Sequence, residues 1–399
     1  MTAIFNAALN YENRWCDFMG YFNPYIDPFK YHLSDSIPSF DKIAYERYRD
    51  HNFVYDKLWI VKSQNLPGGK LEDLFNSKTG KADTVYPIFI KPRWGHLSAS
   101  SKNCFKIKTV EELAPFRNYK EMMWSGFLDA KEGMTDYIFL NGKIMHQITY
   151  IYSDKQHGFT DEWKFVSPDS TPPEHITAWV EKYLKRFTGI VNVQHRGGKI
   201  IEVGLRLARG GAYVIATQCP GLIANINNVV LNHFWDFSRQ DKLSFKPFYV
   251  FKCFTTLPIL YLFPQKILDA LIRSQTKRPF YEYYFEPAGK EGMVFLQFMS
   301  DDLPAGLKIK NRIELLFNSA QLFCYFIIIV FLFLIISLKQ TWYKWLIIFS
   351  IGLLWLTRYL NPITANYNLY KAQKQLIFGD GPQSNQDDPQ EIETFQEEH

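Results

Sequence analysis

Alternating apolar and polar positions predict two β-hairpins in the middle of the chain. Residues 136–152 form two apolar runs around Asn141-Gly142, a dipeptide that favours the tight type I′ turn of a hairpin. Residues 189–206 repeat this arrangement around Arg196-Gly-Gly, with polar groups on otherwise apolar strands. We therefore expect an α+β fold in which antiparallel sheets are combined with helices.

Shorter patterns on either side of the first hairpin predict further elements. Residues 57–61 and residues 86–91 have the composition of strands, and each run leads into a loop of small residues, an arrangement that can hold phosphate. Thr109, three residues before Glu112, has the spacing of a capping box and predicts a short helix. Apolar residues at helical spacing predict another helix over residues 174–187.

Two long apolar runs near the C-terminus predict a transmembrane helical hairpin. Residues 322–338 are long enough to span a bilayer, and residues 345–356 form a shorter second run after a loop of only a few residues. Lys and Arg are more frequent outside the pair of runs than in the loop between them, which places both termini and the main body in the cytoplasm. The alternative is a buried helical hairpin in a soluble core.

The same patterns divide the chain into five segments. Residues 247–272 are apolar and aromatic but contain Pro258 and Pro264, so we expect them to pack in a core or at the membrane interface rather than to span. The expected segments are an N-terminal lead-in or small α/β subdomain (1–52), a main body (53–240), a juxtamembrane segment (241–312), the hairpin (313–360) and a largely disordered acidic tail (361–399).

Composition and charge narrow the range of partners. The net charge of +5 includes seven acidic residues and no Lys or Arg between residues 380 and 399, so the remainder carries +12. Such a body can meet phosphates or anionic lipid, but no arginine-rich run or basic helix marks a nucleic-acid surface, and we expect no nucleic-acid partner. The five cysteines lack CxxC spacing, which argues against a disulfide framework or a zinc site.

The second predicted hairpin carries the most informative polar side chains. Alternation along a strand places Glu202, Gly204 and Arg206 on one side. The carboxylate could hold a divalent metal on a polyphosphate, and the guanidinium could neutralise charge on a transferring phosphoryl group. Gln194, on the neighbouring strand, offers a further oxygen ligand. A Walker A loop, a GxGxxG fingerprint, an HExxH motif and a GxSxG elbow are all absent from the sequence.

The order of these motifs resembles the ATP-grasp superfamily over roughly residues 53–214. Residues 87–98 (PIFIKPRWGHLS) look like its strand and phosphate-covering loop. Residues 189–194 (GIVNVQ) and 200–206 (IIEVGLR) resemble its paired metal-binding strands, and residues 124–136 stand where its adenine hinge would lie. The resemblance implies an ATP-grasp-like body that uses ATP and Mg²⁺. The residues implied to bind ATP are Lys91, Lys57, Trp124 and Ser98; those implied to hold metal are Glu202 and Gln194; and Arg206, with Glu202, is implied to act in catalysis.

The sequence also departs from the family pattern. Position 204 is Gly where Asn commonly binds metal, position 194 is Gln rather than Glu, and no clear Glu follows Trp124. The leading hypothesis is a membrane-anchored ligase that activates a carboxylate as an acyl-phosphate for attack by an amine or similar nucleophile, beside membrane lipid or a membrane protein partner. Two other hypotheses stay open: a catalytically degenerate nucleotide-binding scaffold or regulator, and a lipid-handling membrane protein.

Overall fold

A computed structural model describes most of the chain from residue 33 to residue 337. The described residues are 33–34, 36–76, 84–97, 103–154, 156–157, 160–257, 265–278, 280–288, 292–337, 345–346 and 349–350. The acidic tail and most of the second apolar run therefore lie outside the described residues.

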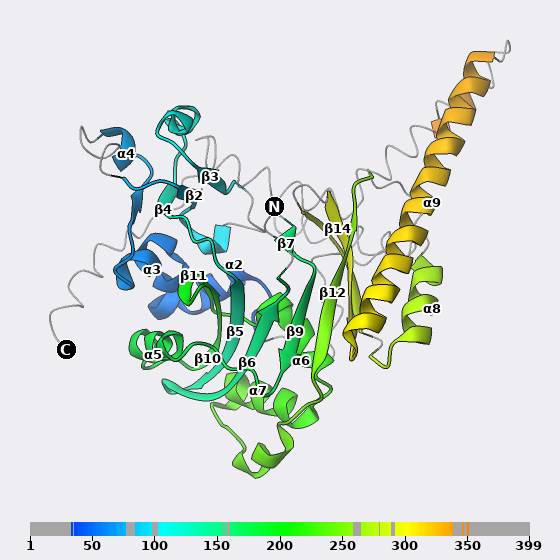
Figure 1. Ribbon diagram of the computed structural model, residues 1–399. Helices are drawn as coiled ribbons and strands as arrows, with labels where there is room; N and C mark the ends of the chain where they lie inside the picture. The colour runs from blue at the N-terminus through cyan, green and yellow to red at the C-terminus, as the bar shows by residue number, and fades with distance from the viewer. Residues whose placement is uncertain are drawn as a thin grey trace.

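An eight-stranded antiparallel sheet forms the centre of the molecule (Figure 1). Its strand order is β11-β10-β5-β6-β9-β12-β14-β13. The strands are β5 (Glu132–Leu140), β6 (Lys143–Tyr152), β9 (Trp163–Ser167), β10 (Gly189–Arg196), β11 (Lys199–Gly204), β12 (Phe248–Thr255), β13 (Tyr281–Pro287) and β14 (Met293–Ser300).

Both predicted hairpins are confirmed as neighbouring strand pairs of this sheet. β5 and β6 are joined by Asn141 and Gly142, whose φ angles of 50° and 77° are both positive, as a type I′ turn requires. β10 pairs with β11 and also with β5. The edge strand β11, which carries the candidate chemistry, is thus fixed by three consecutive antiparallel pairings.

Helices cover both faces of the large sheet. On one face α5 (Glu174–Tyr183) packs against β5 and β10, with Ile176 and Val180 buried beside Tyr137. On the other face α6 (Ala212–Ala216) and α7 (Pro220–Asn232) bury Leu222 and Ile226. The helix predicted over residues 174–187 is confirmed in its first ten residues.

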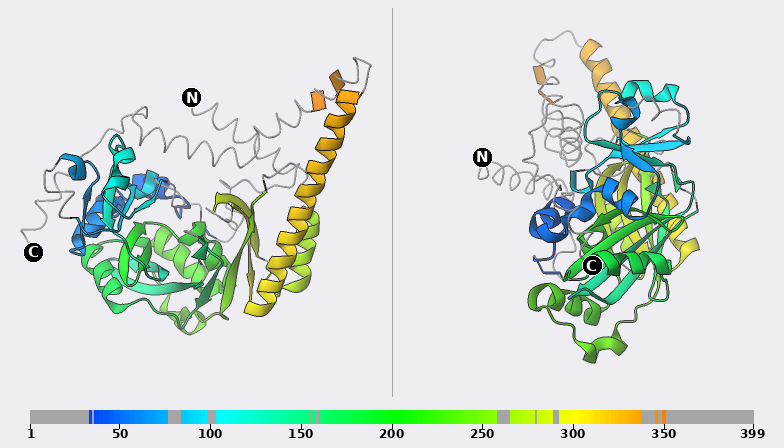
Figure 2. Two further views of the ribbon diagram at one scale, coloured as in Figure 1. Left: turned by 45° about the horizontal axis from the view of Figure 1, so that its top comes forward. Right: turned by 90° about the vertical axis from the view of Figure 1, so that its left-hand side faces the viewer.

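A smaller antiparallel sheet lies above the β11 edge of the large one (Figures 1 and 2). Its order is β1-β4-β2-β3, built from β1 (Gly68–Lys70), β2 (Ile88–Pro92), β3 (Phe105–Ile107) and β4 (Met122–Gly126). β2 confirms the strand predicted at residues 86–91. The region of Thr109 forms the 3₁₀ helix η3 (Glu111–Phe116), which starts after Val110 without a side-chain cap, so the capping box itself is wrong.

The strand predicted at residues 57–61 is wrong, because Lys57–Ser63 is the helix α3. Oδ1 of Asp56 caps this helix by accepting a hydrogen bond from the backbone N of Leu58 at 2.9 Å. The helical turn buries Ile60 in the core beneath β11. Periodicity alone does not separate a strand from a buried helix in an apolar run of about five residues.

Residues 241–312, expected to be a juxtamembrane segment, continue the large sheet. β12 pairs with β9 on one side and with β14 on the other. The helices α8 (Gln265–Gln275) and α9 (Leu303–Ser337) cover this end, where they bury Leu268, Ile313 and Phe317. The remaining short elements are α2 (Asp41–Arg47), η1 (Arg49–Tyr55), α4 (Asp73–Asn76), η2 (Gly95–Leu97), β7 (Gln156–His157), β8 (Thr160–Asp161), η4 (Ala208–Gly211) and η5 (Phe237–Lys242).

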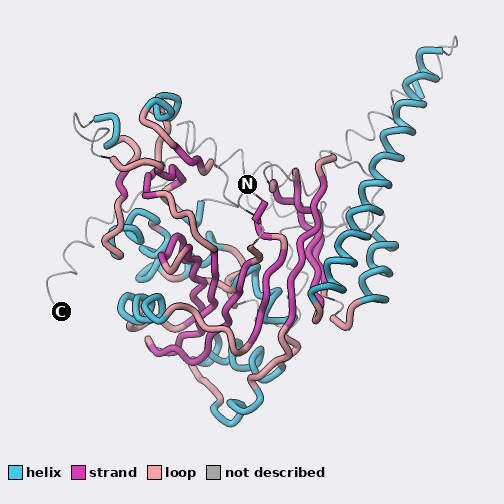
Figure 3. The backbone as a smooth tube through the Cα atoms, viewed as in Figure 1, coloured by secondary structure: helices cyan, strands magenta, loops and turns pink. Residues whose placement is uncertain are grey.

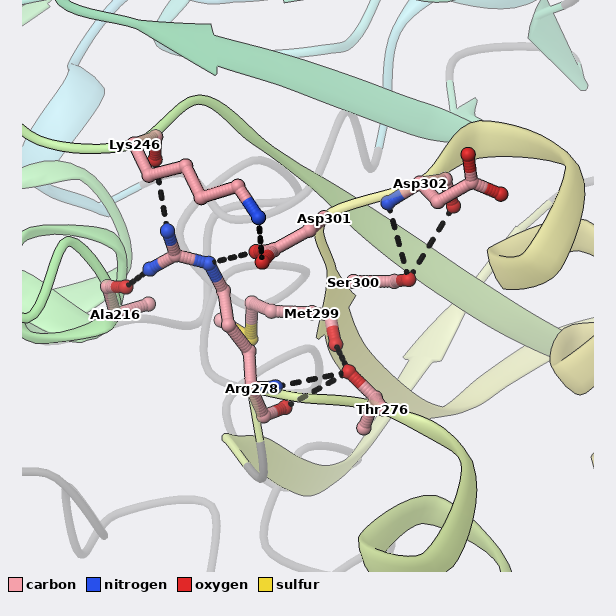
Figure 4. Close-up of polar contacts among 8 residues, drawn as sticks. All are labelled: Ala216, Lys246, Thr276, Arg278, Met299, Ser300, Asp301 and Asp302. Carbon is pink, nitrogen blue, oxygen red and sulfur yellow. Dashed lines mark hydrogen bonds and ion pairs between the residues drawn. The ribbon is translucent and has the colours of Figure 1, made fainter.

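Arg278 ties this end of the sheet to the helices on its other face (Figure 4). Its buried guanidinium donates to the carbonyl oxygens of Ala216 and of Lys246 and to the carboxylate of Asp301. The Lys246 ammonium also contacts Asp301, at 2.8 Å. A charged group with three acceptors is a strong link between segments that lie far apart in the sequence.

α9 is one continuous helix that begins on the sheet and extends well beyond it (Figures 1 and 3). Within the described residues it is the one helix long and apolar enough to cross a membrane, by length and composition alone. Only a few residues of the second apolar run are described, so the predicted hairpin stays a prediction.

Candidate functional site

Two lysines from different elements meet the edge strand β11 beneath the small sheet. Lys57 begins α3, and its Nζ lies 3.3 Å from Oε1 of Glu202. Lys91 lies in β2, and its Nζ donates to the carbonyl oxygen of Ile201 at 3.1 Å. Both lysines are buried, with exposed fractions of 5% and 7%. The structure therefore brings together three of the residues singled out in the sequence.

The two buried lysines form a positively charged site. Burial, and next the neighbouring Lys57 ammonium, lowers the pKa of Lys91 from 10.5 to about 8, while Glu202 opposes the shift. A phosphate group beside the two lysines would accept charge-assisted hydrogen bonds from them and favour their charged forms.

Glu202 has an oxygen-bearing neighbour on the same face of the sheet. Gln194 of β10 is its direct partner across the strand pair, so both side chains point to the same side. Glu202 is only about one-third exposed, and its Oε1 lies close to Gly95, in η2 at the start of the predicted phosphate-covering loop. Glu202 and Gln194 could therefore hold a divalent metal. Across the described part of the chain no three His, Cys, Asp or Glu side chains gather as a metal cluster.

Arg206 is held by a residue that the sequence did not single out. Its Nη2 donates to Oδ2 of Asp41 at 2.7 Å, and its Nη1 donates to the carbonyl oxygen of Leu207 at 3.2 Å. Burial disfavours the charged guanidinium, but the Asp41 carboxylate outweighs this effect and raises the pKa of Arg206. Asp41 lies in α2, within the expected lead-in, and no motif marks it.

Asp136 supports the chain where it leaves β11. Its carboxylate is fully buried and accepts hydrogen bonds from the Tyr150 hydroxyl, the Asn192 side-chain amide and the backbone N of Ala208, the first two at 2.7 Å and the last at 3.0 Å. Burial raises its pKa from 3.8 to about 6, although these hydrogen bonds oppose the shift. An aspartate in the middle of an apolar strand was the signal that could have identified it.

Trp124, a further expected nucleotide contact, is not brought to the lysines. Trp124 pairs with Ile90 and Gly69, whereas Lys91 pairs with Met123, so Trp124 faces the opposite side of the small sheet from Lys91. Its indole packs with the core of that sheet. The role of Trp124 in adenine binding stays a prediction, and Ser98 lies outside the described residues.

Comparisons with known proteins find matches among solved structures alone. No family model matches the chain, and neither does any curated protein sequence. L-amino acid ligase from Bacillus licheniformis is 13% identical, with 65% of this chain and 69% of that chain covered and a TM-score of 0.45. Carboxyaminoimidazole ribonucleotide synthase from Aspergillus clavatus, complexed with ATP, is 10% identical, with 68% and 80% covered and a TM-score of 0.48.

A third similar structure is N5-carboxyaminoimidazole ribonucleotide synthetase from Thermus thermophilus. It is 15% identical, with 68% of this chain and 78% of that chain covered and a TM-score of 0.42. All three TM-scores lie below 0.5.

Proposed function

We propose that the protein is an ATP-dependent ligase of the ATP-grasp type that joins a carboxylate to an amine or similar nucleophile. The observation that carries the proposal is the meeting of Lys57 and Lys91 with Glu202 at the β11 edge. The two lysines come from different elements, α3 and β2, as expected if they grip the phosphates of a nucleotide between the two sheets. The ATP-grasp pattern seen in the sequence assigns the same residues to ATP.

The proposed reaction has two steps. A carboxylate oxygen of the substrate attacks the γ-phosphorus of ATP, and the bond from that phosphorus to the bridging oxygen of ADP breaks. The amine nitrogen then attacks the carbonyl carbon of the acyl-phosphate, inorganic phosphate leaves, and the nitrogen loses a proton to solvent. Lys57 and Lys91 would hold the nucleotide phosphates, and Arg206 would neutralise charge on the transferring phosphoryl group.

A divalent metal fits the donor set at this site. Glu202 and Gln194 present oxygen atoms from paired strand positions, and Mg²⁺ prefers oxygen ligands. When bound, such a metal would offset the negative charge of the nucleotide phosphates. We propose that Glu202 and Gln194 hold it.

We further propose that α9 anchors the body to a membrane. Its first half packs on the sheet, where Phe317 stacks on Phe295 with ring centroids 3.8 Å apart and Asn318 accepts a hydrogen bond from Thr255 at 2.6 Å. Beyond this point large apolar side chains are exposed to solvent, which is unusual for a soluble protein. They include Leu322, Phe323, Phe326, Ile329, Phe331 and Phe333.

Anchoring by α9 in a membrane would also restrict which substrates can reach the site. Because α9 is continuous from the sheet outward, the site would be held at a fixed distance from the bilayer. An amphiphilic carboxylate or amine, or a partner protein in the same membrane, suits that position.

Two features favour a non-catalytic role instead, as a nucleotide-binding scaffold. Gly204 removes one expected metal ligand, and Arg206 already has a carboxylate partner in Asp41. The two functions are separated by measuring ADP release from ATP by the full-length protein in detergent, with mixed carboxylates and amines present. Catalysis predicts substrate-stimulated ADP release that is lost in Glu202→Ala. Nucleotide binding without ADP release under any substrate mixture would favour the scaffold.

A further inference from the structure

The space beside Gly204 is already filled by a carboxylate. A Cβ atom built on Gly204 would lie 2.6 Å from Oδ1 of Asp41, closer than Cβ atoms approach such atoms in proteins. Gly204 faces the same side of β11 as Glu202, two residues earlier. Oδ1 of Asp41 thus occupies the place where a side chain at position 204 would begin.

The two oxygens of Asp41 are used differently. Oδ2 accepts the hydrogen bond from Arg206, whereas Oδ1 is buried and faces Gly204. The Tyr55 hydroxyl lies beside this carboxylate, which adds to the effect of burial in raising the pKa of Tyr55 through its charge and a side-chain hydrogen bond. A carboxylate oxygen has more than one lone pair, so Oδ1 can contact a bound cation as well as the Tyr55 hydroxyl.

An asparagine at position 204 and the aspartate at position 41 exclude each other in this arrangement. The ATP-grasp pattern uses an asparagine at that point as a metal ligand, and this chain has glycine. We propose that Asp41 of α2 replaces this missing ligand, so that Glu202, Gln194 and Oδ1 of Asp41 together hold the divalent metal of the nucleotide complex. This inference rests on the proposed function, because it assumes that a metal–nucleotide complex binds at β11.

The exchange changes the charge of the site. With Asp41 the metal has two anionic protein ligands instead of the single one expected from the sequence. Arg206 stays bonded to the other oxygen of the same carboxylate, which orients Oδ1 toward Gly204. The N-terminal helix α2 would then contribute to metal binding as well as to packing.

The test measures how strongly metal and nucleotide binding depend on each other. The affinity of ADP for the full-length protein in detergent is measured by calorimetry with Mg²⁺ and with EDTA, and bound Mn²⁺ is counted by electron paramagnetic resonance. The variants are Asp41→Ala, Gly204→Asn and the double variant that combines both. The control is Asp236→Asn, because Asp236 has the same carboxylate exposure as Asp41, 22%, and the same 2.7 Å distance to an arginine.

We expect Asp41→Ala to reduce the Mg²⁺-dependent gain in ADP affinity by about tenfold or more, with bound Mn²⁺ lost in parallel. Gly204→Asn alone should also reduce the gain, because its side chain meets Asp41, whereas the double variant should restore it. Asp236→Asn should behave as the wild type. The inference would be overturned if Asp41→Ala kept the full Mg²⁺-dependent gain in ADP affinity. It would also be overturned if Asp41→Ala lowered ADP affinity equally with Mg²⁺ and with EDTA and the added Gly204→Asn did not restore it. Either result would leave the proposed nucleotide site intact. Failure of the wild type to bind ADP would instead refute the proposed function on which the inference rests.

Discussion

Replacing Lys91 with methionine should weaken nucleotide binding and at the same time stabilise the nucleotide-free protein. The Lys91 ammonium is buried, and its pKa falls from 10.5 to about 8 in the folded state. This difference corresponds to about 3 kcal/mol that the charged lysine costs the folded protein below pH 8. Methionine has a similar length and no charge, so we expect Lys91→Met to gain a sizeable part of this amount at pH 7.

Nucleotide affinity should change in the opposite direction. A charge-assisted hydrogen bond to phosphate contributes about 1.5–3 kcal/mol, so Lys91→Met should weaken ATP binding on the order of 10- to 100-fold. In the wild type only protonated Lys91 binds phosphate. Affinity should therefore fall about tenfold between pH 7 and pH 9, and Lys91→Met should not show this fall.

Two measurements on the detergent-solubilised full chain test this reasoning. Urea unfolding at pH 7 gives the change in stability, and calorimetry between pH 7 and pH 9 gives the change in affinity. Lys131→Met is the control, because Lys131 is exposed and paired with Asp154 at the surface, and it should change neither quantity. The reasoning is refuted if Lys91→Met destabilises the protein, or if it retains the affinity and pH dependence of the wild type.

Three further predictions concern the fold around the site. Arg278→Met should lower the free energy of unfolding by about 3 kcal/mol or more, because the buried guanidinium has three acceptors; an unchanged urea midpoint would contradict this. Phe317→Ala should lower the free energy of unfolding by about 3–5 kcal/mol, because Phe317 is fully buried. Phe323→Ala should lower it little in detergent, because Phe323 is 60% exposed. Equal losses of stability in the two variants would show that α9 does not leave the core between these residues. The pKa of Asp136 rises from 3.8 to about 6 on folding, so the folded protein binds this proton more tightly than the unfolded chain. The free energy of unfolding of the wild type, relative to that of Asp136→Asn, should therefore rise by about 1 kcal/mol as the pH falls from 7 to 5. Parallel pH profiles of the two proteins would exclude this assignment.

The sequence was most informative where local chemistry decides the structure. Asn141-Gly142 determines its turn through positive φ angles that few other residues adopt, so the first hairpin could be predicted. The alternation that places Glu202 opposite Gln194 follows from the same local geometry. The helix α3 could not be predicted, because the secondary structure of these residues depends on packing against β11 rather than on their own short apolar pattern.

Long-range contacts account for the rest. Asp41 reaches Arg206 across 165 positions of sequence, and nothing in the residues around Asp41 indicates that meeting. β12 and β14 could not be assigned to the large sheet, since aromatic strands buried on both faces lack the alternation that marks a half-exposed strand.

The most direct test of the central claim is ATP binding by the full-length protein in detergent, measured by calorimetry with and without Mg²⁺. The account predicts saturable binding that Mg²⁺ strengthens and that both Lys57→Met and Lys91→Met weaken by at least about tenfold. Absence of ATP binding in the wild type, under conditions in which its unfolding remains cooperative, would contradict it.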